Sequence, residues 1–211
     1  MPLPPFLPLD VASAFFAAAL VLSAAPGPDN IFVLTQSALF GARAGVVTTL
    51  GLMTGLCGHT LAVALGVAAI FQASPLAFTA LKAVGAVYLL YLAWLTARSG
   101  SARAPLGQRP FPGHAALYRR GIVMNITNPK VTLFFLAFLP QFSSPARGNL
   151  PWQILQLGCL FMLATFLVFG AVALLGGRLA QWLNASPQGQ IIMNRVAAAI
   201  FVLLAATLLL T

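Results

Sequence analysis

The chain has 211 residues, of which 60% are hydrophobic and only 6% are charged. A soluble domain carries roughly 25% charged residues, so this composition cannot supply a water-facing surface. The net charge of +9 does not indicate nucleic-acid binding, because the basic residues cluster beside long apolar runs, where positive charge fixes membrane orientation. We therefore expect an all-α integral membrane protein whose partner is the lipid bilayer and no nucleic acid.

Long apolar stretches predict six membrane-spanning helices. In chain order they cover residues 10–41, 45–71, 76–97, 118–141, 152–176 and 190–210. The first stretch reaches Ser23, Ala24 and Ala25 in the manner of a signal peptide with its cleavage site. No Lys or Arg precedes it, so we expect a retained membrane helix.

The first span is interrupted by the residues AAPGPDNIF at positions 24–32. A continuous helix over residues 10–41 would be about 48 Å long at ~1.5 Å per residue, whereas the hydrocarbon core is about 30 Å thick. A break solves this problem, because proline disrupts the preceding turn and suits the first position of a new helix, and glycine adopts unusual dihedral angles. The residues predicted to form the break and start the second half-helix are Pro26, Gly27, Pro28, Asp29 and Asn30.

The second span contains His59 near its centre, in the sequence GLCGHTL. Histidine changes charge near neutral pH, so His59 is a candidate for carrying a coupled proton. The alternative is a neutral histidine that is hydrogen-bonded between helices. Gly51, Gly55 and Gly58 lie on adjoining helix positions and are predicted to allow close helix packing.

The fourth span has a similar break. In NITNPKV, Asn128 is a good N-cap and Pro129 a good first helical residue, so a helix begins here near the middle of the membrane. Such helix starts bind anionic groups, including the carboxylate of an amino acid. Asn125 lies on the same helix face as Asn128. Gln36 likewise shares a face with Asp29, and we expect both polar faces to line one cavity.

The chain divides into two halves, 1–97 and 118–211, joined by a basic loop at residues 98–117. Three spans in each half force opposite orientations, which is the inverted-repeat arrangement of many secondary transporters. PDNIFVLTQSALF and PKVTLFFLAFLPQF both place a charge directly after a proline, and KAVGAVYLLYLA resembles RVAAAIFVLLAA in the same order. We predict two inverted three-helix repeats with broken helices 1 and 4.

Asp29 and Lys130 each follow the proline of a broken helix and carry opposite charges. Repeats packed about a pseudo-twofold axis bring them together near the midplane, where an unpaired charge costs at least a few kcal/mol. A zwitterionic substrate offers a carboxylate to Lys130 and an ammonium group to Asp29, and Asp29 is a second candidate for proton coupling. The alternative is a purely structural ion pair.

Positive charge predicts the orientation. If the loop is cytoplasmic, Arg147 alone lies in an outside loop, and the remaining loop arginines fall inside: Arg43, Arg98, Arg103, Arg109, Arg119, Arg120 and Arg178. We therefore expect both termini to be periplasmic.

Motifs for other chemistries are missing from the sequence. There is no P-loop, and neither a metal-binding spacing nor a nucleophile motif surrounds the few Asp, His and Cys residues. We expect a protein that is not an enzyme and that has no cofactor and no metal.

Four segments resemble the LysE/RhtB family of amino-acid exporters: PGPDNIFVLTQSALFGARAG, the G-x3-G-x3-H of the second span, ASPLAFTALKAVGAVYLLYLAWL in the third and GIVMNITNPKVTLFFLAFLPQF in the fourth. The resemblance covers nearly the whole chain, and the family signature falls on residues 26–30 and 128–130. It implies a bacterial inner-membrane protein that exports amino acids or their derivatives by proton antiport, and by analogy a homodimer.

The family pattern has an acidic residue near the start of the His-bearing segment, where this chain has Leu56 and Cys57. Asp29 is then the only evident counter-charge within the spans, so threonine- or homoserine-type and other neutral amino acids are favoured over basic ones. The alternatives are an exporter of another small metabolite or ion, and an accessory membrane protein with no transport role.

Overall fold

The computed structural model describes residues 6–73, 75–99 and 110–210, and every regular element in these ranges is helical. The elements are α1 (Leu9–Ala24), α2 (Pro28–Phe40), α3 (Ala42–Ala73), α4 (Pro75–Arg98), α5 (His114–Ile126), α6 (Pro129–Leu133), the π-helix η1 (Phe134–Phe138), the 3-10 helices η2 (Leu139–Phe142) and η3 (Pro145–Arg147), α7 (Leu150–Ala185) and α8 (Pro187–Leu210).

Three of the described helices are long and apolar enough to cross a membrane: Ala42–Gly66 of α3, Leu150–Trp182 of α7 and Pro187–Thr207 of α8. Two bent pairs raise the number to five if each pair is one span. These are α1 with α2, bent by 59°, and α5 with Pro129–Phe142, bent by 48°. The all-helical membrane class is therefore confirmed, and the six-span inverted repeat stays a prediction, since α4 contributes a shorter apolar stretch, Ala83–Arg98.

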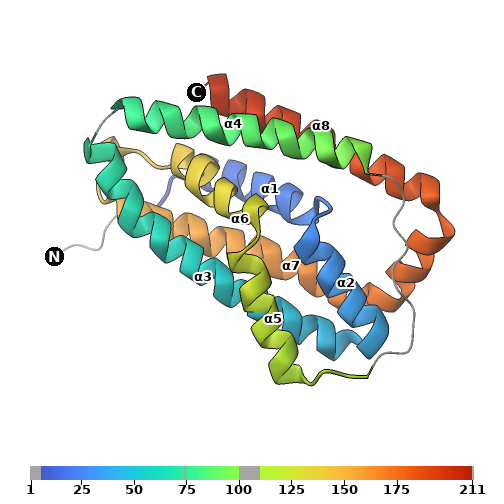
Figure 1. Cartoon of the computed structure of the whole chain (residues 1–211). Helices are drawn as coiled ribbons and strands as arrows, with labels where there is room; N and C mark the ends of the chain where they lie inside the picture. Colours follow the sequence, from blue (N-terminus) through green and yellow to red (C-terminus); the bar gives the residue numbers. More distant parts are fainter. Residues whose placement is uncertain (1–5, 74, 100–109, 211) are drawn as a thin grey trace.

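The helices pack in pairs, as Figure 1 shows. α4 and α8 run side by side along one edge, α3 packs along α7, and α1 and α6 lie between these two pairs. α2 packs mainly on α7, and α5 packs mainly on α3. Both helix breaks consequently lie in the interior of the bundle, where broken backbone avoids contact with lipid.

The outer faces of the long helices carry large apolar side chains. Examples with more than half of their surface exposed are Leu65 on α3, Val87 on α4, Leu174 on α7 and Leu203 on α8. Such a surface suits contact with hydrocarbon rather than with water.

Glycine lets the backbones of α3 and α5 touch. A Cβ atom on Gly121 would lie 2.6 Å from the carbonyl oxygen of Thr48, and one on Gly51 would collide with the carbonyl of Tyr118. The predicted packing role of Gly51 is confirmed. The same prediction for Gly58 is wrong, because Gly58 is exposed and its Cβ position has no neighbour within 4 Å.

Two helix boundaries differ from the predicted ones. α5 begins at His114, directly after Gly113 with its φ of 87°, so residues 114–117 of the predicted loop are helical; residues 100–109 lie outside the described residues. α7 continues past residue 176 to Ala185. Gly176 lies inside this helix, and its missing side chain makes room for Ser37 of α2.

Phenylalanine rings fill the half of the bundle that contains α1 and η1. Neighbouring rings have centroids 4.8 to 6.3 Å apart, in tilted or edge-on arrangements. Such pairs stabilise a core beyond simple area burial. We call this set the phenylalanine cluster: Phe15, Phe134, Phe135, Phe138, Phe142 and Phe161.

Candidate functional site

The break after α1 follows from the sequence of its last turn. An α-helix would pair the carbonyl of Leu22 with the N–H of residue 26, but that residue is Pro26 and has no N–H. The carbonyl oxygens of Leu22 and Ala25 instead accept hydrogen bonds from the Lys130 ammonium group, at 3.0 and 2.9 Å. The amide of Asn30 donates to the carbonyl of Ser23 at 2.7 Å. Two polar side chains therefore satisfy carbonyl oxygens at the end of α1.

The second half-helix, α2, begins as predicted with Pro28 in its first turn. Gly27 has extended backbone angles, with a φ of -167°, so unusual dihedral angles are not the reason for a glycine here. Space is the reason: a Cβ atom on Gly27 would lie 3.3 Å from Lys130 Nζ and 3.4 Å from its Cδ. The absence of a side chain at residue 27 lets the lysine reach the end of α1.

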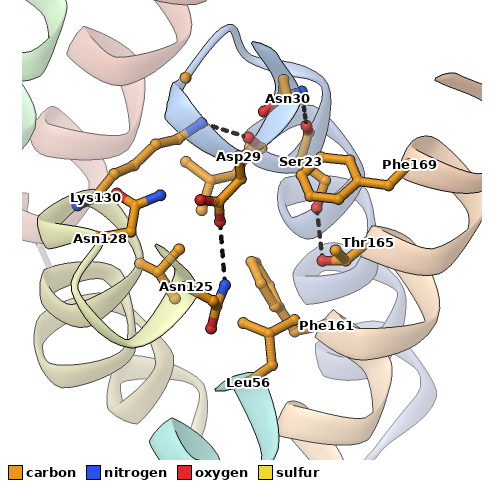
Figure 2. Close-up of a pocket in the computed structure, with 13 residues that line it drawn as sticks. Ser23, Asp29, Asn30, Leu56, Asn125, Asn128, Lys130, Phe161, Thr165 and Phe169 are labelled. Carbon is orange, nitrogen blue, oxygen red and sulfur yellow. Dashed lines mark hydrogen bonds between the residues drawn. The ribbon is translucent and has the colours of Figure 1, made fainter. Parts of the chain in front are cut away.

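The corresponding break between α5 and α6 is built around Asn128. Its side-chain oxygen accepts from the backbone N–H of Lys130 at 3.0 Å, and Pro129 occupies the first turn of α6. The predicted N-cap is therefore confirmed. It fixes the start of α6 so that the Lys130 side chain extends across the bundle to α1, as Figure 2 shows.

Asp29 is buried, with 4% of its surface exposed, at the start of α2. Its Oδ2 atom accepts a hydrogen bond of 3.1 Å from the side-chain amide of Asn125, and its Oδ1 atom has no partner. A buried carboxylate oxygen without a partner is costly, so this atom is poised to accept a donor from a ligand.

A small cavity of about 20 Å³ lies between the two breaks. Residues of both half-chains line it, among them Asp29, Asn125, Asn128 and Lys130 (Figure 2). Its volume has room for about one water-sized group. The predicted meeting of the two polar helix starts is thus present in this structure.

The predicted ion pair differs in detail. Among the described residues no ion pair joins Asp29 and Lys130, because the lysine donates to the carbonyls of α1 and the aspartate accepts from Asn125. An ammonium group has three N–H donors, and two are used here. Both charged groups therefore keep unused hydrogen-bonding capacity inside one cavity.

The other sequence-predicted residues lie farther from the cavity. His59 is half-buried on α3, its Nε2 atom is 3.2 Å from the backbone oxygen of Asn125, and its ring packs on Phe135. Gln36 is buried on α2 but lines neither this cavity nor the wider one described next. Seven residues along a helix return to the same face but advance about 10.5 Å, which explains its distance from Asp29.

A wider cavity of about 630 Å³ adjoins the small one. Gly27, Asn30, Asn128 and Lys130 line both. From the breaks the wider cavity extends along α4 and α8 to Ser99, at the end of α4. The prediction from sequence missed this space, because the polar residues that line it on α4 and α8, such as Tyr88, Thr96 and Asn194, are few and widely spaced.

Sequence reasoning also missed two hydroxyl groups in the small cavity. Ser23 and Thr165 are buried, line the cavity and share a hydrogen bond of 3.1 Å between α1 and α7. The available signal was weak: each is a single small polar residue in an apolar run.

Comparison with known proteins identifies the family of the chain. Residues 20–211 match the family described as LysE type translocator. The chain belongs to this family. The expected resemblance is confirmed, and the two helix breaks that border the small cavity lie within the matched residues.

Relatives align over most of their length. The homoserine/homoserine lactone efflux protein of Salmonella typhimurium is 33% identical over 195 residues, covering 92% of this chain and 94% of that protein. The leucine efflux protein of Enterobacter sp. is 30% identical over 203 residues, covering 94% and 92%. An uncharacterized membrane protein of Vibrio cholerae is 32% identical over 196 residues, covering 92% and 93%. No solved structure matches this translocator.

Proposed function

We propose that this protein exports neutral amino acids or their derivatives across the bacterial inner membrane by proton antiport. The relatives named for homoserine, homoserine lactone and leucine efflux support the substrate class. The observation that carries the proposal is one small cavity lined by a carboxylate and an ammonium group, each with unused hydrogen-bonding capacity. In this proposal the substrate ammonium group binds Asp29 Oδ1, and its carboxylate takes the third N–H of Lys130.

The arrangement of arginines supports entry from the cytoplasm. The C-terminal ends of α2 and α4 and the N-terminal ends of α5 and α8 lie at one end of the bundle. Phe40 of α2 packs on Phe111 before α5, and Asn194 of α8 donates to the backbone oxygen of Ser99 after α4. Arg43 and Arg98 are exposed at this end, together with Arg119, Arg120 and Arg178. The wider cavity extends to the same end, while the phenylalanine cluster fills the other half. Positive charge near span ends marks the cytoplasmic side, so this conformation is open to the cytoplasm and both termini are periplasmic.

Proton coupling follows from competition at Asp29. A protonated carboxyl group has lost the charge that attracts an ammonium group, so Asp29 holds either a proton or the substrate. His59 touches the backbone of Asn125, and Asn125 donates to Asp29. In this proposal Asp29 exchanges its proton with the cavity, and the charge of His59 acts on Asp29 through the position of Asn125.

Packing supports the inverted repeat and leaves the oligomer as a prediction. The first broken helix packs on α7 of the other half, and the second packs on α3 of the first half. A twofold relation between the halves would also exchange α3 with α7 and α4 with α8, and the helices of each of these pairs are in contact. A homodimer stays a prediction from the family resemblance.

The test is uptake into proteoliposomes under an imposed pH gradient, with labelled leucine, threonine and homoserine. Asp29→Asn and Lys130→Met are compared with Asp10→Asn and Arg195→Met, which change exposed charges of the same kind on α1 and α8. We expect gradient-driven uptake that the first two variants abolish and the controls retain, with all four proteins folded by thermal unfolding. His59→Gln should keep substrate exchange without a gradient and lose the response to pH.

Two results contradict the proposal. Uptake that survives both Asp29→Asn and Lys130→Met leaves a transporter with a different site. No uptake of any neutral amino acid favours export of another metabolite or ion, or an accessory protein whose Asp29 and Lys130 only hold the helix breaks together.

A further inference from the structure

We propose that the wider cavity receives the side chain of the exported amino acid and selects long, uncharged, apolar side chains. This inference rests on the proposed function and extends it from neutral amino acids in general to a narrower class. The small cavity has room for the ammonium group beside Asp29, the carboxylate binds Lys130 where the two cavities meet, and the wider cavity distinguishes among side chains. The two cavities share four lining residues, Gly27, Asn30, Asn128 and Lys130, so one amino acid can occupy both.

Charge disfavours basic side chains. Among the described residues that line the wider cavity, Lys130 is the only charged one, and it stands at the inner end where the substrate carboxylate binds. The whole chain has two acidic residues, Asp10 and Asp29. Asp10 is exposed in the first turn of α1, and Asp29 is assigned to the substrate ammonium group. A basic side chain in the wider cavity would therefore lack a counter-charge and meet the repulsion of Lys130.

The lining favours apolar groups over hydroxyl groups. Near the breaks the walls include Ile31 and Leu34 of α2 and Phe201 of α8, whose ring centroid lies 5.5 Å from Lys130 Nζ. Leu92 and Leu95 of α4 and Met193 of α8 line the cavity farther along these helices.

Polar groups are the minority of the lining. Asn30 and Asn128 at the breaks bond to the backbone, and other hydroxyl and amide groups, such as Tyr88 and Asn194, lie farther along α4 and α8. A substrate hydroxyl group would therefore gain less from this lining than a methyl group of similar size.

Size favours long side chains. At about 630 Å³ the wider cavity far exceeds the small one of about 20 Å³. A methyl or hydroxymethyl group at the breaks would leave the apolar walls unfilled. Each additional methylene group buries further apolar surface, which is worth ~0.8 kcal/mol or about fourfold in affinity.

The experiment titrates purified protein in lipid nanodiscs with alanine, 2-aminobutyrate, norvaline and norleucine, by calorimetry. We expect affinity to rise about fourfold per methylene group, and about sixtyfold from alanine to norleucine. Two matched ligand pairs separate charge and polarity from length. Ornithine, which is norleucine with an ammonium group in place of its last methyl, should bind at least tenfold more weakly than norleucine. Homoserine should bind more weakly than norvaline, whose methyl group replaces the hydroxyl.

A matched pair of variants locates the effect. Leu95 lines the wider cavity and is 40% exposed, whereas Leu90 is 43% exposed on the same helix and does not line it. Leu95→Asn should reduce the preference for norleucine over alanine at least fivefold, and Leu90→Asn should leave it unchanged. Because both changes place the same amide on one helix at similar exposure, any general effect on folding is shared.

Each outcome separates this inference from the proposed function. Equal affinity along the series, with binding still lost in Asp29→Asn, overturns the inference and leaves amino-acid recognition intact; a lipid chain then occupies the wider cavity. Equal effects of Leu95→Asn and Leu90→Asn also overturn it. If no amino acid binds, the proposed function fails and this inference fails with it.

Discussion

Gly55 of α3 connects helix packing to the charged cavity. A Cβ atom at this position would lie 2.6 Å from Asn125 Oδ1 and 2.7 Å from Asn125 Cβ. Asn125 has 1% of its surface exposed, so its side chain has nowhere to move. Ordinary contact begins at 3.4 Å, so Gly55→Ala must separate α3 from α5 by about 0.7 Å (3.4 − 2.7), or displace the amide that donates to Asp29.

The expected cost follows from these distances. Overpacking a filled site destabilises a protein by about 1–3 kcal/mol. Replacing a helical glycine by alanine contributes up to about 1 kcal/mol in the opposite direction. Gly58→Ala, on the same helix with no neighbour within 4 Å, receives only this second contribution. We therefore expect Gly55→Ala to be less stable than Gly58→Ala by about 1–3 kcal/mol.

The assay is thermal unfolding of both variants in one detergent, with leucine uptake measured in parallel. Gly55→Ala should also lose at least tenfold in uptake, since the Asn125–Asp29 hydrogen bond is disturbed. Equal stability and equal uptake of the two variants would refute the close approach of α3 to Asn125 on which this reasoning depends.

Three further changes test separate contacts. Gly27→Ala should keep near-native stability, because its extended backbone suits alanine, but should weaken substrate binding through the 3.3 Å contact with Lys130 Nζ; calorimetry and thermal unfolding measure the two effects. Asn128→Ala should destabilise the protein by about 1 kcal/mol through loss of the N-cap, and Asn128→Ser should recover most of it in thermal unfolding. A double-mutant cycle of Ser23→Ala and Thr165→Ala should give a coupling of about 0.5–1.5 kcal/mol for their buried hydrogen bond, and additive effects would contradict that contact.

The sequence was sufficient to predict both helix breaks. Pro28 and Pro129 have the same physical effect wherever they occur in a long apolar segment, and the excess length of the first span requires a bend. Asn128 was likewise predictable as an N-cap, because capping is a local interaction over a few residues.

The partner of Lys130 was not predicted. Opposite charges at corresponding positions indicate that two groups lie near each other, but not which acceptors they choose. Here the carbonyl of Leu22 needs a donor because residue 26 is a proline, and the lysine supplies it. The rotation of α4 and α8 was not predicted for another reason: their polar residues, such as Tyr88 and Asn194, are too few to give a clear periodicity that shows which face borders a cavity.

The π-helix η1 directly follows the turn that carries Lys130. A π-helical segment contains one residue more than an α-helical path of the same length. Conversion of η1 to α-helical geometry would therefore rotate α6 against η2 by about 100°, the angle per residue of an α-helix, with little change in the separation of its ends. The extra residue of η1 therefore allows the turn that carries Lys130 to rotate. This residue lies in the phenylalanine cluster, which fills the opposite half of the bundle. Deletion of a single residue within 134–138 would remove this extra residue, so the segment should tolerate a shorter chain that a regular helix would not.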